Sequence, residues 1–238
     1  CHEKFTSLEQ EYYEVMSELE AENILLETRD PLSFEPLEIK LTPGRFSSII
    51  RVALYHPSTR QLLPYAIHSA AEGNYHAILG LMGGTMSQNS IYLGLMLSVV
   101  CGEDLPRATP ELFAQDGNNE FIGSRTGDAF VDMCAGWQSS SVPSYWYDPV
   151  VSDKPVLLLS GELDPVTPPE WGEIAHRTLP NSKHLIAPNA GHTIASHTCA
   201  NKLIADFIEQ GSIENIDGSC LKEQRLKPFV LNQNAAGL

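Results

Sequence analysis

The chain has 238 residues, of which 42% are hydrophobic and 19% charged, and its 30 acidic and 15 basic side chains give a net charge of −15. This balance excludes a disordered, collagen-like or low-complexity chain. It also opposes binding to nucleic acid or to anionic lipid, because both require a cationic surface. A small cationic group is a more natural ligand, and the length suits one domain with a cap.

No stretch of the sequence is expected to span a membrane, because the most apolar run, Ile91 to Cys101, is about half of the roughly twenty residues required. Residue 1 is a cysteine, so we expect this end to result from cleavage or truncation. Five cysteines are present and none falls in a CxxC pair. The odd number fits buried thiols, or two disulfides plus one cysteine whose partner lies outside the chain.

Residues 1–90 have the pattern of helices. An amphipathic helix that ends near Glu22 is predicted by apolar residues at alternating spacings of three and four, namely Phe5, Leu8, Tyr12, Val15 and Leu19. Further helical pieces are expected from Pro43 to Met82, and Pro64 must lie in the first turn of its helix or kink it. Gly83-Gly84 is then expected to break the chain.

After residue 90 the pattern predicts alternating strands and helices. Three apolar segments are predicted as strands, at 95–100, 155–160 and 182–187. Helices are expected between and after them, at about 107–117, 124–138, 168–179 and 196–210. This alternation predicts an α/β fold with a parallel sheet of about three strands. We therefore expect a helical cap over residues 1–90 and an α/β portion over residues 91–238.

Acidic residues and a histidine follow the expected strands. Glu103 and Asp104 end the first strand, Asp164 follows the second and His192 follows the third. Because the carboxyl ends of parallel strands share the edge where ligands bind, we expect Asp164 and His192 to lie together. Such an aspartate accepts the imidazole Nδ1–H and stabilises the imidazolium. Either residue alone is more often a turn aspartate or a loop histidine, but the joint pattern favours a catalytic pair.

The segment PVLLLSGELDPVTPPEWGEIAHRTLPNSKHLIAPNAGH, residues 155–192, resembles the catalytic end of an α/β-hydrolase of the proline iminopeptidase and tripeptidyl aminopeptidase-like family. ALYHPSTRQLLPYAIHSAAEGNYHAIL resembles the helical cap of that family, and VVCGED the strand after it. The resemblance implies that Asp164 is the acid and His192 the base of a Ser-Asp-His triad. It also implies a disulfide between Cys199 and Cys220 and, next, one between Cys101 and Cys134. Disulfides in turn imply a secreted or periplasmic protein.

The family also has a nucleophile that this sequence lacks. Its members carry a serine in a G-x-S-x-G elbow that precedes the acid and the histidine, and no serine here has those neighbours. We therefore expect the chain to be the cap and C-terminal part of a serine hydrolase. The serine, the oxyanion hole, the N-terminal half of the hydrolase and the partner of Cys1 would then lie outside it.

Glu103 and Asp104 are the candidate substrate-binding residues. The resemblance implies that acidic side chains near the cleft hold the free α-ammonium of a peptide by a charge-assisted hydrogen bond, whereas the alternative role is to cap the next helix. We expect an aminopeptidase acting on small, amino-terminally free peptides, with an esterase or a non-catalytic truncated domain as alternatives. No cofactor and no metal are expected, since the spacing of His192 and His197 is one residue longer than that of a helical zinc pair.

Overall fold

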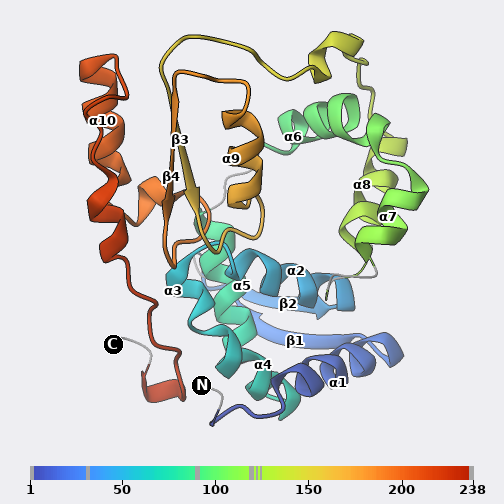
Figure 1. Cartoon of the computed structure of the whole chain (residues 1–238). Coiled ribbons are helices and arrows are strands. Elements are labelled where there is room, and N and C mark those ends of the chain that lie inside the picture. Colours follow the sequence, from blue (N-terminus) through green and yellow to red (C-terminus); the bar gives the residue numbers. More distant parts are fainter. Residues whose placement is uncertain are drawn as a thin grey trace. The chain divides into compact units, whose positions relative to one another are not determined.

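The structure is a computed structural model that describes residues 3–30, 33–88, 92–117, 121, 123 and 125–235 (Figure 1). The chain forms two compact units: Cys1–Gly83 with Pro149–Leu238 is the first, and Gly84–Asp148 is the second. The C-terminal segment therefore belongs to the same unit as the N-terminal helices, which differs from the expected division at residue 90. The role of residues 1–90 as a lid stays a prediction, and Cys1 lies outside the described residues.

The N-terminal part of the first unit is helical around one hairpin. Its elements are α1 (Leu8–Ala21), β1 (Ile24–Arg29), β2 (Pro36–Leu41), α2 (Pro43–Ala53), α3 (Pro57–Arg60), α4 (Leu63–Ala71) and α5 (His76–Gln88). The predicted amphipathic helix is α1, which packs against α2 and α4 and buries Tyr12, Val15 and Leu19. Thr42 starts α2 because its side chain accepts a hydrogen bond from the Arg45 N–H at 3.2 Å.

Two features of this region differ from expectation. The antiparallel hairpin of β1 and β2 was not predicted, although Ile39 and Leu41 show the alternating burial of a strand. The expected break at Gly83-Gly84 is wrong, because α5 continues to Gln88. A glycine inside a helix lowers its stability by about 1 kcal/mol, which does not suffice to end it. Pro64 lies in the first turn of α4, as expected.

The C-terminal part of the first unit is a βαβ unit. β3 (Val156–Gly161) and β4 (Ser182–Ala187) are parallel, with α9 (Pro169–His176) between them in the chain. These are the predicted strands at 155–160 and 182–187, with the predicted helix between them. α10 (Ala200–Gln210) lies on the opposite side of the strands from α9 (Figure 1). Among the described residues β3 pairs with β4 alone, so one edge of an apolar, half-buried strand has no partner strand.

A compact core joins the two strands to α10. It contains Ala187, Ala190, Ile194, Ala200, Leu203, Ile216 and Leu221, and the half-buried Cys199 and Cys220 pack against it. These two cysteines form a disulfide with a Cα–Cα distance of 6.4 Å. The core and the disulfide fix the chain that follows β4, which is the segment that carries His192.

The second unit is helical. It contains α6 (Leu93–Val99), a π-helical turn (Val100–Asp104), a 3₁₀ turn (Leu105–Arg107), α7 (Pro110–Gly117), α8 (Arg125–Ala135) and a second 3₁₀ turn (Ser144–Tyr147). The expected disulfide between Cys101 and Cys134 is present, with a Cα–Cα distance of 5.4 Å. It ties the π-helical turn to α8.

The predicted strand at 95–100 is wrong, because these residues belong to α6 and the π-helical turn. An apolar run of this length does not distinguish a buried strand from a helix. Leu97 is buried while Leu95 is 66% exposed, so this apolar segment is a surface helix with one buried side. No helix in the described part of the chain has the length and apolar character needed to cross a bilayer.

Candidate catalytic pair and its surroundings

Asp164 and His192 lie on the loops that follow β3 and β4. The Nδ1 atom of His192 is 2.9 Å from Oδ2 of Asp164, which is hydrogen-bond distance. Because a carboxylate can only accept, Nδ1 carries the hydrogen and donates it. The other ring nitrogen, Nε2, is then the one that can accept a proton from a hydroxyl. The structure thus brings the two predicted residues together in the geometry of a triad acid and base.

The Asp164 side chain is 4% exposed and fully hydrogen-bonded by its own loop. Its Oδ1 accepts the N–H groups of Val166 at 2.8 Å and Thr167 at 3.0 Å, and its Oδ2 accepts the Thr167 hydroxyl at 2.9 Å. Burial is the largest single effect on its pKa and raises it, but the hydrogen bonds from Thr167, Val166 and His192 together outweigh burial. The pKa of Asp164 therefore lies below its usual range, so the carboxyl stays ionised beside His192.

The loop that carries His192 has an unusual backbone. Asn189 and Thr193 both adopt the left-handed conformation, with φ of 58°, which is rare for a β-branched residue such as threonine. The Asn189 N–H donates to Oε2 of Glu162 at 2.8 Å, so Glu162 supports the loop. Residues held in such conformations concentrate at functional sites.

Two glycines allow these loops to approach each other. A Cβ atom on Gly161, at the end of β3, would collide with the carbonyl oxygens of Gly191 and Ala190. A Cβ atom on Gly191 would collide with the carbonyl oxygen of Tyr55. The glycine of the GELD segment and the glycine of the AGH segment are therefore required by close backbone contacts.

Glu103 lies on the π-helical turn of the second unit, and π-helical turns occur frequently at functional sites. One of its oxygens, Oε2, accepts the indole N–H of Trp146 at 2.8 Å, and its carbonyl accepts the Tyr147 hydroxyl at 3.0 Å. The side chain of Glu103 is thus held beside aromatic rings, while Asp104 is exposed. That either residue faces His192 and binds an ammonium group stays a prediction.

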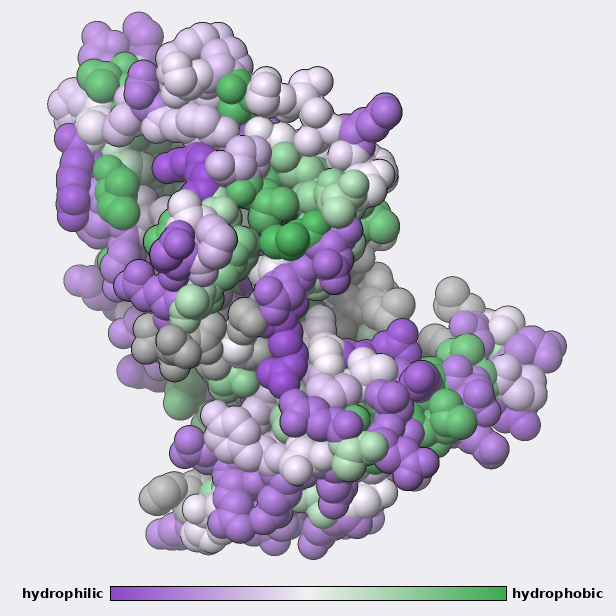
Figure 2. Space-filling view, turned by 90° about the vertical axis from the view of Figure 1, so that its right-hand side faces the viewer, coloured by the Kyte–Doolittle hydropathy of each residue, from purple (hydrophilic) through white to green (hydrophobic). Residues whose placement is uncertain are grey.

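Large apolar side chains also reach the surface, where Figure 2 shows hydrophobic patches among mostly hydrophilic side chains. Trp171 on α9 is 64% exposed, so most of its side chain lies at the surface.

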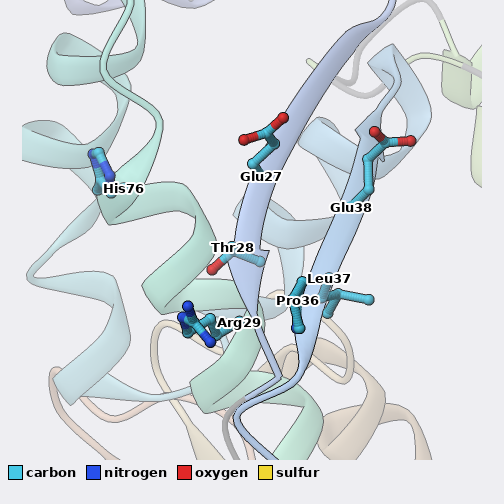
Figure 3. A pocket seen from close by; sticks show the side chains of 7 residues that line it. All are labelled: Glu27, Thr28, Arg29, Pro36, Leu37, Glu38 and His76. Atoms are coloured by element: carbon cyan, nitrogen blue, oxygen red, sulfur yellow. The ribbon is translucent and has the colours of Figure 1, made fainter.

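A polar cleft of about 830 Å³ lies on the hairpin, apart from the predicted residues, and is lined by Glu27, Thr28, Arg29, Pro36, Leu37, Glu38 and His76 (Figure 3). Glu27 and Glu38 are directly opposite each other in the strand register, and like charges in this position destabilise a sheet. Nη1 of Arg29 donates a hydrogen bond to the Phe34 carbonyl oxygen at 2.9 Å. In the part of the chain that is described, no three His, Cys, Asp or Glu side chains gather closely enough to hold a metal ion.

The parallel strands β3 and β4, with α9 between them in the chain, are consistent with an α/β-hydrolase type of fold. The comparisons with known proteins support this class: the family model described as TAP-like protein matches residues 119–220. No solved structure matches the chain significantly.

Two curated relatives are similar to part of the chain. Both are pimeloyl-[acyl-carrier protein] methyl ester esterases, from the serogroup B strains H44/76 and MC58 of Neisseria meningitidis. Each is 43% identical over 61 residues, which is 25% of this chain and 24% of the relative. The chain is therefore similar to these esterases over about a quarter of their length, and the matches support an α/β-hydrolase family.

Sequence reasoning missed two residues that contact the pair. Thr167 donates to Asp164, and its position three residues after an aspartate is the signal of a side-chain turn. Tyr55 contacts His192 through its ring and its carbonyl. Nothing in the sequence pairs Tyr55 with His192, because the contact joins segments distant in the chain.

Proposed function

We propose that this chain carries the acid and the base of a serine hydrolase whose nucleophilic serine lies outside it. The observation that carries the proposal is the hydrogen bond between His192 and the buried, ionised Asp164. The unpartnered edge of β3 supports it, because a hydrolase sheet continues beyond the acid-bearing strand. The serine oxygen would attack the carbonyl carbon of the scissile bond while its proton passes to Nε2 of His192. His192 would then give this proton to the leaving group as the scissile bond breaks, and a water molecule deprotonated by the same nitrogen would release the acyl group from the serine.

Among hydrolases we propose an aminopeptidase-like enzyme of the proline iminopeptidase and tripeptidyl aminopeptidase type. The acidity of the chain and the carboxylate of Glu103, fixed by Trp146, support binding of an amino-terminally free peptide. The two disulfides support a secreted or periplasmic protein.

An esterase is the second candidate, and the similarity to the methyl ester esterases favours it. Hydrolysis of an ester requires the same acid and base but no carboxylate that binds an ammonium group. The two candidates therefore differ in what Glu103 does.

The test is covalent labelling with a fluorophosphonate probe, applied to residues 1–238 and to the product of the complete reading frame. We expect no labelled serine in the first, because it has no G-x-S-x-G elbow, and one labelled serine in the second. The label should be lost in His192→Ala and kept in His184→Ala, a histidine of β4. A complete protein that has no labelled serine, or whose label survives His192→Ala, would refute the proposal.

A further inference from the structure

The backbone of His192 is held by Tyr55, which follows α2 in the chain. The N–H of His192 donates to the Tyr55 carbonyl oxygen at 2.7 Å. The Tyr55 ring meets the imidazole edge to face, with centroids 5.3 Å apart and an interplanar angle of 63°. One residue thus contacts both the backbone and the ring of the candidate base.

Tyr55 is itself fixed in place. The Nη1 atom of Arg51 donates to the Tyr55 hydroxyl at 2.8 Å, and the guanidinium carbon is 5.6 Å from the centre of the Tyr55 ring. Arg51 lies one helical turn before Tyr55, so the guanidinium reaches the phenol along the same segment. This pair of contacts limits the orientations that the Tyr55 ring can adopt.

A second arginine of the same segment holds the loop from its other end. Nη2 of Arg60 donates to the carbonyl of Asn189 at 2.9 Å, the residue in the left-handed conformation three positions before His192. Gly191 leaves no room for a side chain against the Tyr55 carbonyl. The loop is therefore clamped on both sides of Gly191 by residues of one segment.

The polar side-chain contacts of the imidazole lie at one atom, Nδ1, which is 2.9 Å from Oδ2 of Asp164 and 3.4 Å from the Thr167 hydroxyl oxygen. Contacts at Nδ1 still allow the ring to rock about that atom, which moves Nε2. A second contact on the ring restricts this motion, and proton transfer is sensitive to such displacements.

We propose that Tyr55, oriented by Arg51, is a positioning residue for His192. The role of His192 as a base rests on the proposed function, but the restriction of its ring by Tyr55 does not. Tyr55 acts through His192 and needs no contact with substrate.

The test follows the Nδ1 proton of His192 by NMR of the ¹⁵N-labelled chain, with the signal assigned by its loss in His192→Gln. Removing the ring contact in Tyr55→Leu should speed exchange of this proton with water by about two- to ten-fold, the range for loss of one aromatic contact. Arg51→Gln should act in the same direction and more weakly. Tyr55→Phe should fall between the parent protein and Tyr55→Leu, because it keeps the ring and loses only the hydroxyl.

The matched control is Tyr65→Leu, which removes a half-buried tyrosine ring of α4 in the same unit and should leave the exchange rate unchanged. If Tyr55→Leu does not fold, the exchange rates of Arg51→Gln and Tyr55→Phe test the positioning role of Tyr55. Unchanged exchange in the folded Tyr55 and Arg51 variants would overturn the proposal, as would an equal effect in Tyr65→Leu. The readout needs no nucleophile, so a failure of the hydrolase assignment shows in the serine labelling and a failure of the positioning role shows here.

Discussion

The two units of the chain are stabilised in different ways. In the first, large apolar side chains are fully buried, among them Phe46, Leu19, Leu41, Ile78 and Leu221. Among the described residues of the second, the buried apolar set consists of Leu97 and Cys101, while Tyr92, Leu95 and Tyr145 are all more than 60% exposed. In the second unit the Cys101–Cys134 disulfide joins the π-helical turn to α8 where few apolar side chains are buried.

This contrast fits the proposed function, in which the two units would have different tasks. An acid and a base must be held within a fraction of an ångström, which a packed unit with buried hydrogen bonds provides. Regions that recognise ligands are often drawn from the less stable parts of a protein, and exposed aromatic side chains beside Glu103 suit contact with a substrate. Substitutions in each unit can show whether catalysis and recognition are divided between them in this way.

The largest effect is expected in the first unit, from Asp164→Asn in the complete enzyme. Asparagine keeps an oxygen for the N–H groups of Val166 and Thr167, but its amide no longer holds the productive tautomer of His192. We expect kcat to fall about 10⁴-fold with little change in folding. Asp153→Asn, which alters an exposed aspartate of the same unit, is the control. A loss of less than ten-fold in steady-state assays would contradict the role of Asp164.

Removing each disulfide tests the contrast in stability. The loops closed by the bonds span 33 residues in the second unit and 21 in the first, so the chain-entropy model gives a similar value of about 3–4 kcal/mol for each. The same loss should have unequal consequences because the second unit has so few buried side chains. We expect Cys101→Ala with Cys134→Ala to open residues 84–148 to limited proteolysis, and Cys199→Ala with Cys220→Ala to lower the urea midpoint while the core persists. Equal protease resistance of 84–148 in both variants would contradict the contrast.

Glu103→Gln tests recognition by the second unit. Glutamine retains an oxygen for the Trp146 indole and removes the charge. In the complete enzyme we expect kcat/KM for amino-terminally free peptides to fall about ten- to a hundred-fold, the effect of losing one charge-assisted hydrogen bond. Simple esters should be hydrolysed at the parental rate, and Asp128→Asn on α8 is the control. Equal losses on both substrates would remove the ammonium-binding role.

Gly191→Ala tests the close packing of the first unit. Its Cβ atom would collide with the Tyr55 carbonyl, and overpacking of this kind destabilises by about 1–3 kcal/mol. The matched control is Gly80→Ala on α5, where no atom lies within 4 Å of the added Cβ and alanine favours the helix by about 1 kcal/mol. Chemical denaturation should show a lower free energy of unfolding for Gly191→Ala and a higher one for Gly80→Ala. An unchanged free energy of unfolding in Gly191→Ala would contradict the close contact with Tyr55.

The smallest effect concerns acid sensitivity of the first unit. Burial first, and then His56, Arg60 and Lys227, lower the pKa of His197 from 6.5 to about 4. Between these values the unfolded chain binds a proton that the folded chain does not, so stability falls as the pH drops from 6.5 to about 4. His197→Gln should flatten this part of the urea-midpoint profile. The matched control is His76→Gln, which replaces an exposed histidine at the start of α5. Identical profiles for the parent protein and His197→Gln would refute the prediction.

The sequence predicted best where a local pattern and burial agree. The three- and four-residue spacing that gave α1 and the apolar segments that gave β3 and β4 reflect side chains that are buried or half-buried in the first unit. The juxtaposition of Asp164 and His192 followed from the rule for strand ends, and the cysteine pairs from the family resemblance. In the second unit the apolar run at 95–100 buries Leu97 but exposes Leu95 and Val99, so its pattern indicated the wrong element.

The contacts around His192 could not be predicted, because they join residues far apart in sequence through backbone atoms. Every residue has a backbone carbonyl, so the sequence gives no sign that the carbonyl of Tyr55 accepts the N–H of His192. The hairpin of β1 and β2 was missed for another reason: only Ile39 and Leu41 are buried along the two strands, and a short half-exposed strand leaves a weak signal.

The two disulfides join cysteines that are consecutive along the chain, Cys101 with Cys134 and Cys199 with Cys220. A polypeptide that enters an oxidising compartment from its N-terminal end exposes its thiols in this order. Each pair can therefore close as soon as its second member emerges. Disulfide isomerases should then be dispensable for the formation of these two bonds.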